Sequence, residues 1–153
     1  MSEKMKIFLE IAGKLSKNFD IIPVLYGSLG LSLALKEDLP INDIDILVPD
    51  EYLEERWADL SQAISNLGFE LVDLREHEFI RAGEKIAFAK YQTLRDIGLT
   101  AADLPETEIN GIKFKLPASG QFLEIYKYSQ ADGYRRDKRN DAEKIRLLEK
   151  HIH

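Results

Sequence analysis

The sequence predicts an α+β fold, in which helices flank a mixed β-sheet and two further helices close the chain. Three observations indicate this fold. Helical and strand-like segments alternate in the first half of the chain. Three short strand-like runs follow one another in the second half, which argues against a purely parallel sheet. Two helical segments then end the sequence.

The first half is expected to place two buried strands among its helices. Apolar residues at helical spacing predict a helix over about residues 3–17. The run IIPVLY, Ile21–Tyr26, is almost wholly apolar and suits a strand buried on both faces, with Pro23 placing its first half at a sheet edge. A helix is expected to begin at Ser28, and a second buried strand to span Ile44–Pro49.

A long helix is expected after the second strand. Asp50 is a typical N-cap residue, and Gly68 is typical of the end of a helix. Between them an apolar stripe repeats at helical spacing: Leu53, Trp57, Leu60, Ile64 and Leu67. This stripe would pack on the domain.

The second half predicts short strands joined by tight turns. The three strand-like runs are Phe69–Leu74, His77–Ala82 and Lys85–Gln92. A Gly83-Glu84 turn is expected between the last two, and residues 93–106 are expected to be a loop. Asn110-Gly111 is the strongest short hairpin signal and predicts a further hairpin around it. The two final helices are expected at about 119–130 and 140–151.

Length and composition bound the class of protein. The 153 residues fit one domain, which we expect to comprise an α/β core, residues 1–117, and a helical segment, residues 118–153. The net charge of -6 argues against binding of extended nucleic acid, which needs a basic field. The absence of cysteine excludes disulfides and zinc-thiolate sites. Because no stretch resembles a signal peptide or a membrane span, we expect a cytoplasmic protein without membrane contact.

Two aspartates in the second strand suggest a metal site. Asp43 and Asp45 are two residues apart, so in a strand they would point to the same face about 6.5 to 7 Å apart. Their repulsion would cost roughly 1 to 3 kcal/mol, depending on the effective dielectric constant. Mg²⁺ held by one or two carboxylates, and completed by water and substrate phosphates, would offset that cost.

A Gly-Ser pair before the intervening helix suggests a phosphate site. Gly27 lets the backbone turn closely, and Ser28 begins a helix whose free N–H groups and dipole favour an anion. Each residue also has a simpler structural interpretation, with Ser28 as an N-cap and Asn42-Asp43 as turn residues. Asp45 fits such an interpretation less well, because a charged residue in an apolar run is seldom buried without a partner.

The same residues resemble the signature of a known family. A hydrophobic strand ending in Gly27-Ser28, a helix, and then Asp43-Ile44-Asp45 on the next strand resemble the nucleotidyltransferase fold of the DNA polymerase beta superfamily. The resemblance implies transfer of a nucleoside monophosphate from a nucleoside triphosphate to an acceptor, with two Mg²⁺ ions held by three carboxylates. It implies that Gly27 and Ser28 contact the triphosphate and that Asp43 and Asp45 are catalytic metal ligands.

The C-terminal part is similar to small bacterial nucleotidyltransferase-like proteins of the abortive-infection toxin type. In these proteins a helix bearing a lysine is followed by a basic and acidic segment that opens the last helix. Lys127 and Asp141 stand at the matching positions and are implied to contact the nucleotide. Independently of the resemblance, four basic residues in the segment between the two helices offer positive charge that could neutralise substrate phosphates: Arg135, Arg136, Lys138 and Arg139. Alternatively, residues 134–141 form a solvated linker with Asn140 or Asp141 as an N-cap.

The third carboxylate of the superfamily is not evident in the sequence. It normally lies on a central strand after the Asp-x-Asp strand, but the run IAFAKY contains no acid. The nearest alternatives are Glu76, Glu78 and Glu84, which stand at strand ends or in a hairpin where surface glutamates are common. Two acids can bind a metal nucleotide yet leave the acceptor poorly activated.

Two classes of function therefore stay open. The first is a magnesium-dependent nucleotidyltransferase with a small-molecule or macromolecular acceptor. The second is a binding or regulatory module, such as a partner in a toxin system, in which the fold survives without efficient chemistry. A glycosyltransferase fits less well, because the chain is short for that fold and Gly-Ser is not part of its motif. An open cleft and a third carboxylate close to Asp43 and Asp45 would favour the enzyme.

Overall fold

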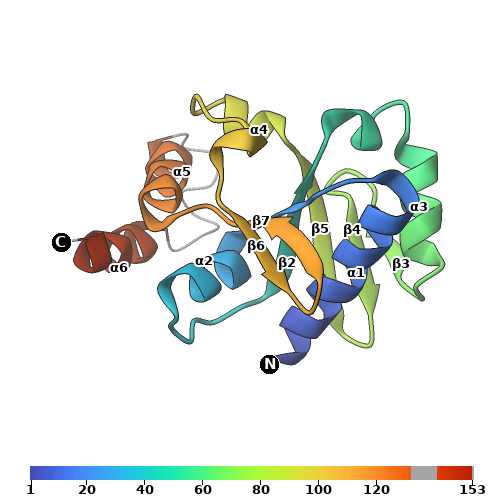
Figure 1. The fold of residues 1–153 in the computed structure, drawn as a ribbon, viewed down its shortest axis with the longest axis horizontal. Helices are drawn as coiled ribbons and strands as arrows, with labels where there is room; N and C mark the ends of the chain where they lie inside the picture. Colours follow the sequence, from blue (N-terminus) through green and yellow to red (C-terminus); the bar gives the residue numbers. More distant parts are fainter. Residues whose placement is uncertain (132–140, 153) are drawn as a thin grey trace.

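The computed structural model describes residues 1–131 and 141–152, which form a seven-stranded mixed sheet with helices on both faces (Figure 1). The strands are β1 (Val24–Tyr26), β2 (Asp43–Val48), β3 (Glu70–Asp73), β4 (Glu78–Arg81), β5 (Glu84–Lys90), β6 (Glu106–Ile109) and β7 (Ile112–Lys115). The α-helices are α1 (Glu3–Phe19), α2 (Gly27–Leu35), α3 (Trp57–Ser65), α4 (Gln92–Arg95), α5 (Ser119–Ala131) and α6 (Asp141–Ile152). The predicted α+β fold with two C-terminal helices is confirmed.

Strand β2 lies at the centre of the sheet, whose order is β3-β4-β5-β2-β1-β7-β6. It runs antiparallel to β1 and parallel to β5, and all six of its residues pair with β5. Strands β3, β4 and β5 are joined as antiparallel neighbours, and β7 runs parallel to β1. Both neighbours of β2 therefore fix the register of the two aspartates.

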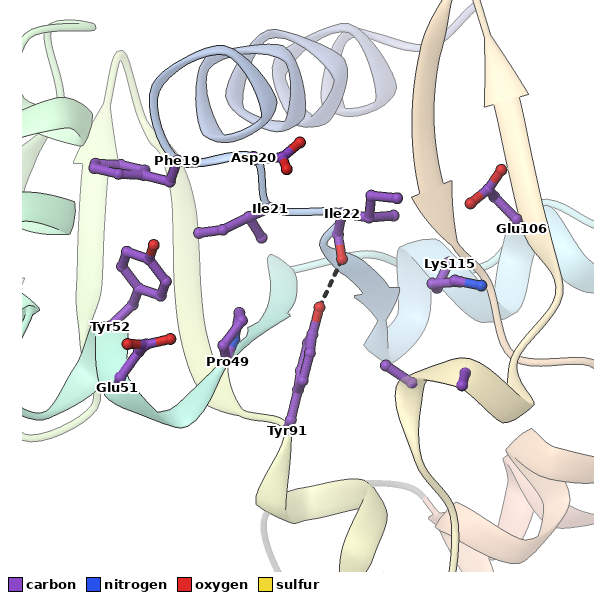
Figure 2. Close-up of a pocket in the computed structure, with 12 residues that line it drawn as sticks. Phe19, Asp20, Ile21, Ile22, Pro49, Glu51, Tyr52, Tyr91, Glu106 and Lys115 are labelled. Carbon is purple, nitrogen blue, oxygen red and sulfur yellow. Dashed lines mark hydrogen bonds between the residues drawn. The ribbon is translucent and has the colours of Figure 1, made fainter.

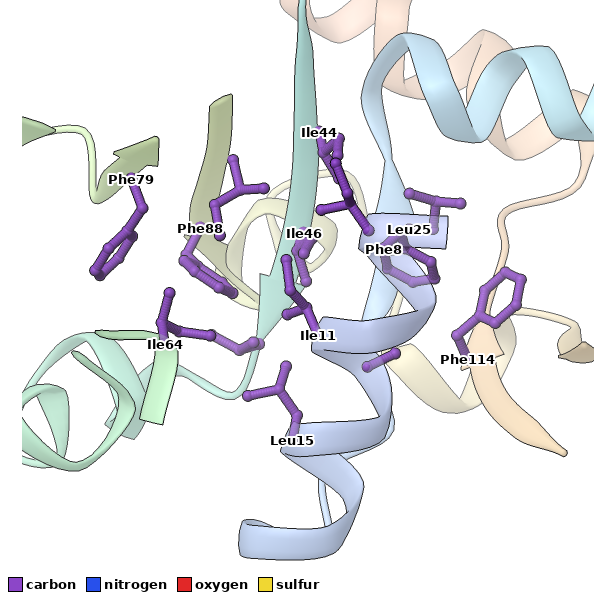
Figure 3. Packing of buried hydrophobic residues seen from close by; sticks show 14 of the residues in the cluster. Phe8, Ile11, Leu15, Leu25, Ile44, Ile46, Ile64, Phe79, Phe88 and Phe114 are labelled. Atoms are coloured by element: carbon purple, nitrogen blue, oxygen red, sulfur yellow. The ribbon is translucent and has the colours of Figure 1, made fainter. Parts of the chain in front are cut away.

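Helices α1 and α3 cover one face of the sheet. The side chains of Ile44, Ile46 and Val48 point to this face, because alternate residues of a strand share a side. In Figure 3 the α1 side chains, including Phe8, point toward the sheet. The rings of Phe8 and Phe114 meet edge to face, with their centroids 5.0 Å apart. This apolar packing buries the face of β2 that is opposite to the two aspartates.

Helices α2, α5 and α6 lie on the opposite face (Figure 1). Leu47 points to this second face and belongs to a separate apolar cluster with Phe122 of α5 and Leu148 of α6. Because side chains alternate along β2, Asp43 and Asp45 point to the same face as Leu47. The two aspartates and the β2 side chains that pack against α1 therefore lie on opposite faces of the sheet.

Strand β1 is shorter than predicted, because Ile21–Pro23, the half predicted to lie at a sheet edge, is outside the strand. It begins at Val24 and pairs on both sides, with β2 and β7. Pro23 precedes the strand, so its missing N–H group costs the ladder nothing. Its carbonyl group accepts a hydrogen bond from the backbone N–H of Lys115 at 2.8 Å.

The predicted start of a long helix directly after β2, with Asp50 as its N-cap, is also wrong. A 3₁₀ turn, η1 (Asp50–Leu53), comes first, and α3 begins only at Trp57. The Asp50 carboxylate accepts a hydrogen bond from the backbone N–H of Gln92 at 3.1 Å and pairs with Arg95. The Asp50 carboxylate therefore accepts a hydrogen bond at the N-terminus of α4, not at the N-terminus of the helix that follows β2. Most of α4 lies in the segment predicted to be a loop. A second 3₁₀ turn, η2 (Ala101–Asp103), lies in the same segment.

Two hairpins have the two-residue turns that suit twisted strands. Asn110 and Gly111 have φ values of 54° and 79°, which confirms the predicted Asn-Gly hairpin between β6 and β7. The turn between β4 and β5 is Ala82-Gly83, with φ values of 50° and 81°. The predicted Gly83-Glu84 turn is off by one residue, because Glu84 already pairs with Arg81 in the ladder.

Candidate functional site

Asp43 and Asp45 lie at the start of β2, in the interior of the sheet. Asp45 pairs with Tyr26 of β1 on one side and with Ala87 of β5 on the other. Its side chain is buried, with 8% of its surface exposed, whereas Asp43 is half-buried. The sheet therefore holds the two acids rigidly on one face, as the sequence predicts for residues two apart in a strand.

Gly27 lies directly against the carboxylate of Asp45. Its φ is 69°, and a Cβ placed on it would stand 2.1 Å from Oδ2 of Asp45. Both the backbone conformation and the space around it therefore require glycine. Gly27 is also the first residue of α2, so the Asp45 carboxylate lies at the positive end of a helix dipole.

A cavity of about 980 Å³ opens in front of these residues. Ser28, Asp43 and Asp45 line one side of it, so the structure brings these three predicted site residues together. Gly27 lies behind Asp45 and does not line the cavity. The loop after α2 and helix α6 also line the cavity, through Leu39 and Leu147 among others.

Acidic side chains dominate the cavity wall. Besides the aspartate pair, the acids that line it are Glu37, Asp73, Glu76, Glu78 and Glu143. Among the described residues of the wall, Lys144 of α6 is the basic one. Its ammonium group lies 5.0 Å from the ring centroid of Tyr126. The sequence gives no local sign of Lys144, because α6 reaches the site only through tertiary packing.

The three alternatives for a third carboxylate lie in different places. Glu84 points to the other face of the sheet, where it pairs with Lys4 of α1. Glu76 lies in the turn before β4, and Glu78 pairs with Ala87 of β5. Burial raises the pKa of Glu78, and the nearby charge of Asp43 raises it further. Within residues 1–131 and 141–152, no three His, Cys, Asp or Glu side chains are placed to hold a metal ion together.

The residues implied by the C-terminal resemblance are not part of the cavity wall as described. Lys127 is exposed on α5 and does not line the cavity. Asp141 is the first residue of α6, but its side chain lies outside the described part of the structure. The basic residues Arg135, Arg136, Lys138 and Arg139 also lie outside the described residues.

A second cavity of about 430 Å³ lies at the opposite ends of β1 and β2 (Figure 2). It is lined by Ile22, just before β1, and by Pro49, just after β2. The Tyr91 hydroxyl donates a hydrogen bond to the carbonyl oxygen of Ile22 at 2.6 Å. Burial raises the pKa of Tyr91 to about 12. Tyr91 therefore forms its hydrogen bond at the end of β1 and β2 that is remote from the aspartates.

Comparison with known proteins supports the fold. The chain is 40% identical over 148 residues to the uncharacterized protein YnaI of Bacillus subtilis, covering 95% of each chain. Its structure is similar to that of ANT(2'')-Ia in complex with adenylyl-2''-tobramycin, with a TM-score of 0.65, 15% identity, and coverage of 99% of this chain and 91% of that one. It also resembles an antigenic nucleotidyltransferase-like protein from Paracoccidioides brasiliensis, with a TM-score of 0.62, 18% identity, and coverage of 95% and 75%.

These likenesses show a nucleotidyltransferase-like fold. No family model matches the chain. The resemblance to the toxin type stays a prediction. No described helix combines the length and the apolar character that crossing a bilayer requires.

Proposed function

We propose that this chain, which belongs to the same family as YnaI of Bacillus subtilis, is a magnesium-dependent nucleotidyltransferase. It would move a nucleoside monophosphate from a nucleoside triphosphate to a small-molecule or macromolecular acceptor. One observation carries the proposal: Asp43, Asp45 and Ser28 line a single cavity in a nucleotidyltransferase-like fold. The complex of ANT(2'')-Ia with adenylyl-2''-tobramycin is a precedent for a nucleotidylated small molecule on this fold.

The donor groups of the site fit Mg²⁺. Asp43 and Asp45 offer carboxylate oxygens, which this hard cation prefers, and they project from one face of one strand. Asp45 is buried close to Asp43. A bound cation would offset the electrostatic repulsion between the two carboxylates. When bound, Mg²⁺ would neutralise charge on the triphosphate and polarise the reacting phosphoryl group.

The chain's own residues would hold the triphosphate at the start of α2. The Ser28 hydroxyl and the free N–H groups of the first helical turn are donors for phosphate oxygens. In the transfer, an acceptor oxygen bonds to the α-phosphorus as the bond from that phosphorus to the pyrophosphate oxygen breaks. The acceptor loses its proton and pyrophosphate leaves. The cavity of about 980 Å³ beside the aspartates is at the upper end of the range typical of ligand pockets.

A nucleotide-binding module without efficient chemistry is the second candidate. The observation that favours it is that the described acids do not converge in groups of three that could hold a metal ion. Such a module would bind the magnesium nucleotide through Asp43 and Asp45 but would release no pyrophosphate. The two candidates share the binding site and differ in turnover.

Thermal unfolding with each nucleoside triphosphate, with and without Mg²⁺, tests the shared site. A ligand at a hundred times its dissociation constant should add about 2.7 kcal/mol to the free energy of unfolding, or roughly 5 to 10 °C to the Tm. We expect this shift in the wild type and its loss in Asp43→Asn/Asp45→Asn. The matched control is Glu55→Gln/Glu108→Gln, which removes two exposed acids outside the cavity.

Pyrophosphate release then separates the two candidates. If a nucleotide stabilises the wild type but a broad set of acceptors elicits no pyrophosphate, the binding module is correct. If no nucleotide shifts the Tm of the wild type, both candidates fail.

A further inference from the structure

We infer that the second cavity, of about 430 Å³, binds an α-amino acid with an apolar side chain. This cavity lies at the end of β1 and β2 that is remote from Asp43 and Asp45. Among the described residues, none lines both this cavity and the one beside the aspartates. The site is therefore separate from the proposed nucleotide site and independent of the proposed function.

The cavity lies at one end of the sheet, between the two apolar clusters of the protein. Phe19 and Tyr52 on one side pack in the cluster that α1 covers. Tyr91 and Ala101 pack against the other cluster, which contains side chains of α5 and α6. In Figure 2 Pro49 lies between the side chains of Tyr52 and Tyr91. A volume of about 430 Å³ is within the range typical of small-molecule pockets, and this wall suits an uncharged, apolar group.

Glu106 and Lys115 place an acid and a base next to each other in the wall of the same cavity (Figure 2). They are directly paired residues of the antiparallel strands β6 and β7, so they share a face with their Cβ atoms about 4.5 to 5.5 Å apart. The structure does not join the two side chains in an ion pair. Because an α-amino acid carries its carboxylate and its ammonium group on one carbon atom, two neighbouring opposite charges can bind both groups at once.

The ammonium group of Lys115 has hydrogen-bonding capacity left for a ligand. It donates to the carbonyl oxygen of Leu104 at the long distance of 3.4 Å, although an ammonium group carries three N–H donors. Lys115 is half-buried, whereas Glu106 is exposed. A charge with less water around it attracts an opposite charge more strongly. Lys115 is therefore the group that would bind the carboxylate of the amino acid.

Backbone contacts fix Lys115 relative to the apolar wall. The backbone N–H of Lys115 donates to the carbonyl oxygen of Pro23 at 2.8 Å, and Lys115 pairs with Val24 of β1. The carbonyl oxygen of Ile22, one residue before Pro23, accepts the hydrogen bond of the Tyr91 hydroxyl at 2.6 Å. The charged end and the apolar wall thus share the segment that leads into β1. A small ligand would enter a preformed site, which keeps the entropic cost of binding low.

Two further acids in the wall restrict which ligands fit. Asp20 and Glu51 are exposed and, together with Glu106, outnumber the one base Lys115. This excess of negative charge would repel an acidic side chain or a phosphate group on the ligand. A simple amine would leave Lys115 without a carboxylate. A zwitterion with an apolar side chain matches both the charges and the apolar wall.

Isothermal titration calorimetry with L-leucine and L-phenylalanine tests the inference without any enzymatic reaction. We expect at least one of them to bind the wild type with a Kd below about 1 mM. Each amino acid has two matched analogues, its amide, which lacks the carboxylate, and its deamino acid, which lacks the ammonium group. Both analogues should bind at least about tenfold more weakly than the amino acid. L-Glutamate, with its second carboxylate, should not bind detectably.

Two variants locate the binding site. Lys115→Gln should weaken amino-acid binding by at least about tenfold, whereas Lys113→Gln, which removes an exposed lysine of the same strand outside the cavity, should change it by less than about twofold. Glu106→Gln should weaken binding of the amino acid by at least about threefold without weakening that of the deamino acid. Circular dichroism would verify that each variant is folded.

Two results would overturn the inference. One is that neither amino acid binds the wild type, and the other is that Lys115→Gln binds them with wild-type affinity. Neither result bears on the proposed function, which is tested with nucleotides at the other cavity.

Discussion

The carboxylate of Asp45 packs against the backbone of Gly27, so closely that a Cβ at Gly27 would lie 2.1 Å from Oδ2 of Asp45. The Gly-Ser turn and the Asp-x-Asp strand are thus joined by a direct contact within the protein. The need for glycine follows from this contact and from a φ of 69°, before any ligand is considered. A substitution at either residue should therefore be felt at the other.

Gly27→Ala should destabilise the protein by about 2 to 5 kcal/mol. The left-handed conformation costs a non-glycine residue roughly 1 to 2 kcal/mol, and forcing a methyl group into an occupied space costs about 1 to 3 kcal/mol. Urea unfolding followed by circular dichroism measures the change in the free energy of unfolding.

Gly83→Ala is the matched control for this variant. Gly83 has a φ of 81°, but a Cβ there would meet nothing within 4 Å. Gly83→Ala should therefore cost only the roughly 1 to 2 kcal/mol of the left-handed conformation. Asp45→Ala should also recover part of the loss in Gly27→Ala, as a coupling energy in a double-mutant cycle. Equal costs for the two glycine variants, or no coupling, would disprove the contact.

Asp50→Ala should destabilise the protein by about 1 kcal/mol, because the Asp50 carboxylate accepts the backbone N–H of Gln92 at the start of α4. Asp50→Asn keeps an acceptor oxygen and should lose much less. The pair with Arg95 adds little, since the Arg95 side chain is half exposed. Urea unfolding compares the three proteins. Equal losses in the two variants would instead assign the effect to the charge.

The sequence was sufficient where the deciding forces are local. Alternation along β2 predicted that Asp43 and Asp45 share a face, and Asn110-Gly111 predicted its hairpin, because both follow from the backbone of a few residues. The sequence predicts a helix start at Ser28 for the same reason, and the helix begins one residue earlier, at Gly27.

The features that sequence reasoning missed depend on partners far along the chain. Asp50 is a good N-cap by type, but its partner is the N–H of Gln92, which the parallel pairing of β2 with β5 brings close. The alignment of Asp45, Ala87 and Glu78 across neighbouring strands depends on the registers of two strand pairs. Neither register can be read from the letters of a single strand.

Tyr91→Phe should cost about 1 kcal/mol, because the Tyr91 hydroxyl donates to the carbonyl oxygen of Ile22 at 2.6 Å (Figure 2). Burial raises the pKa of Tyr91 to about 12, above the ordinary value of about 10. The stability linked to this residue should be complete below about pH 10 and fall as the pH rises toward 12. A phenylalanine side chain has no such proton, so the variant should lack this component.

The control for Tyr91→Phe is Tyr128→Phe, since Tyr128 is 48% exposed. Urea unfolding at neutral pH should show no more than a small change for that control. An equally small change for Tyr91→Phe would mean that the hydrogen bond to Ile22 does not contribute to stability.

Glu78→Gln should slightly stabilise the ligand-free protein at neutral pH. Burial raises the pKa of Glu78 and the charge of Asp43 raises it further, so the folded state disfavours the ionised side chain. The stability linked to Glu78 is therefore complete below its ordinary pKa and is lost as the pH rises through the folded value. The gain in Glu78→Gln should appear at about pH 7, vanish at about pH 4, and not exceed about 0.5 kcal/mol, because solvent screens this group.

Urea unfolding at both pH values, with and without added salt, measures this gain. Salt should reduce the part that comes from Asp43, since it screens charges near the surface. Removal of Asp43 in Asp43→Asn should likewise reduce the gain. A Glu78→Gln protein that is less stable than the wild type at neutral pH would show that the ionised carboxylate is favoured in the fold. In that case Glu78 and Asp43 would not repel each other in the ligand-free protein.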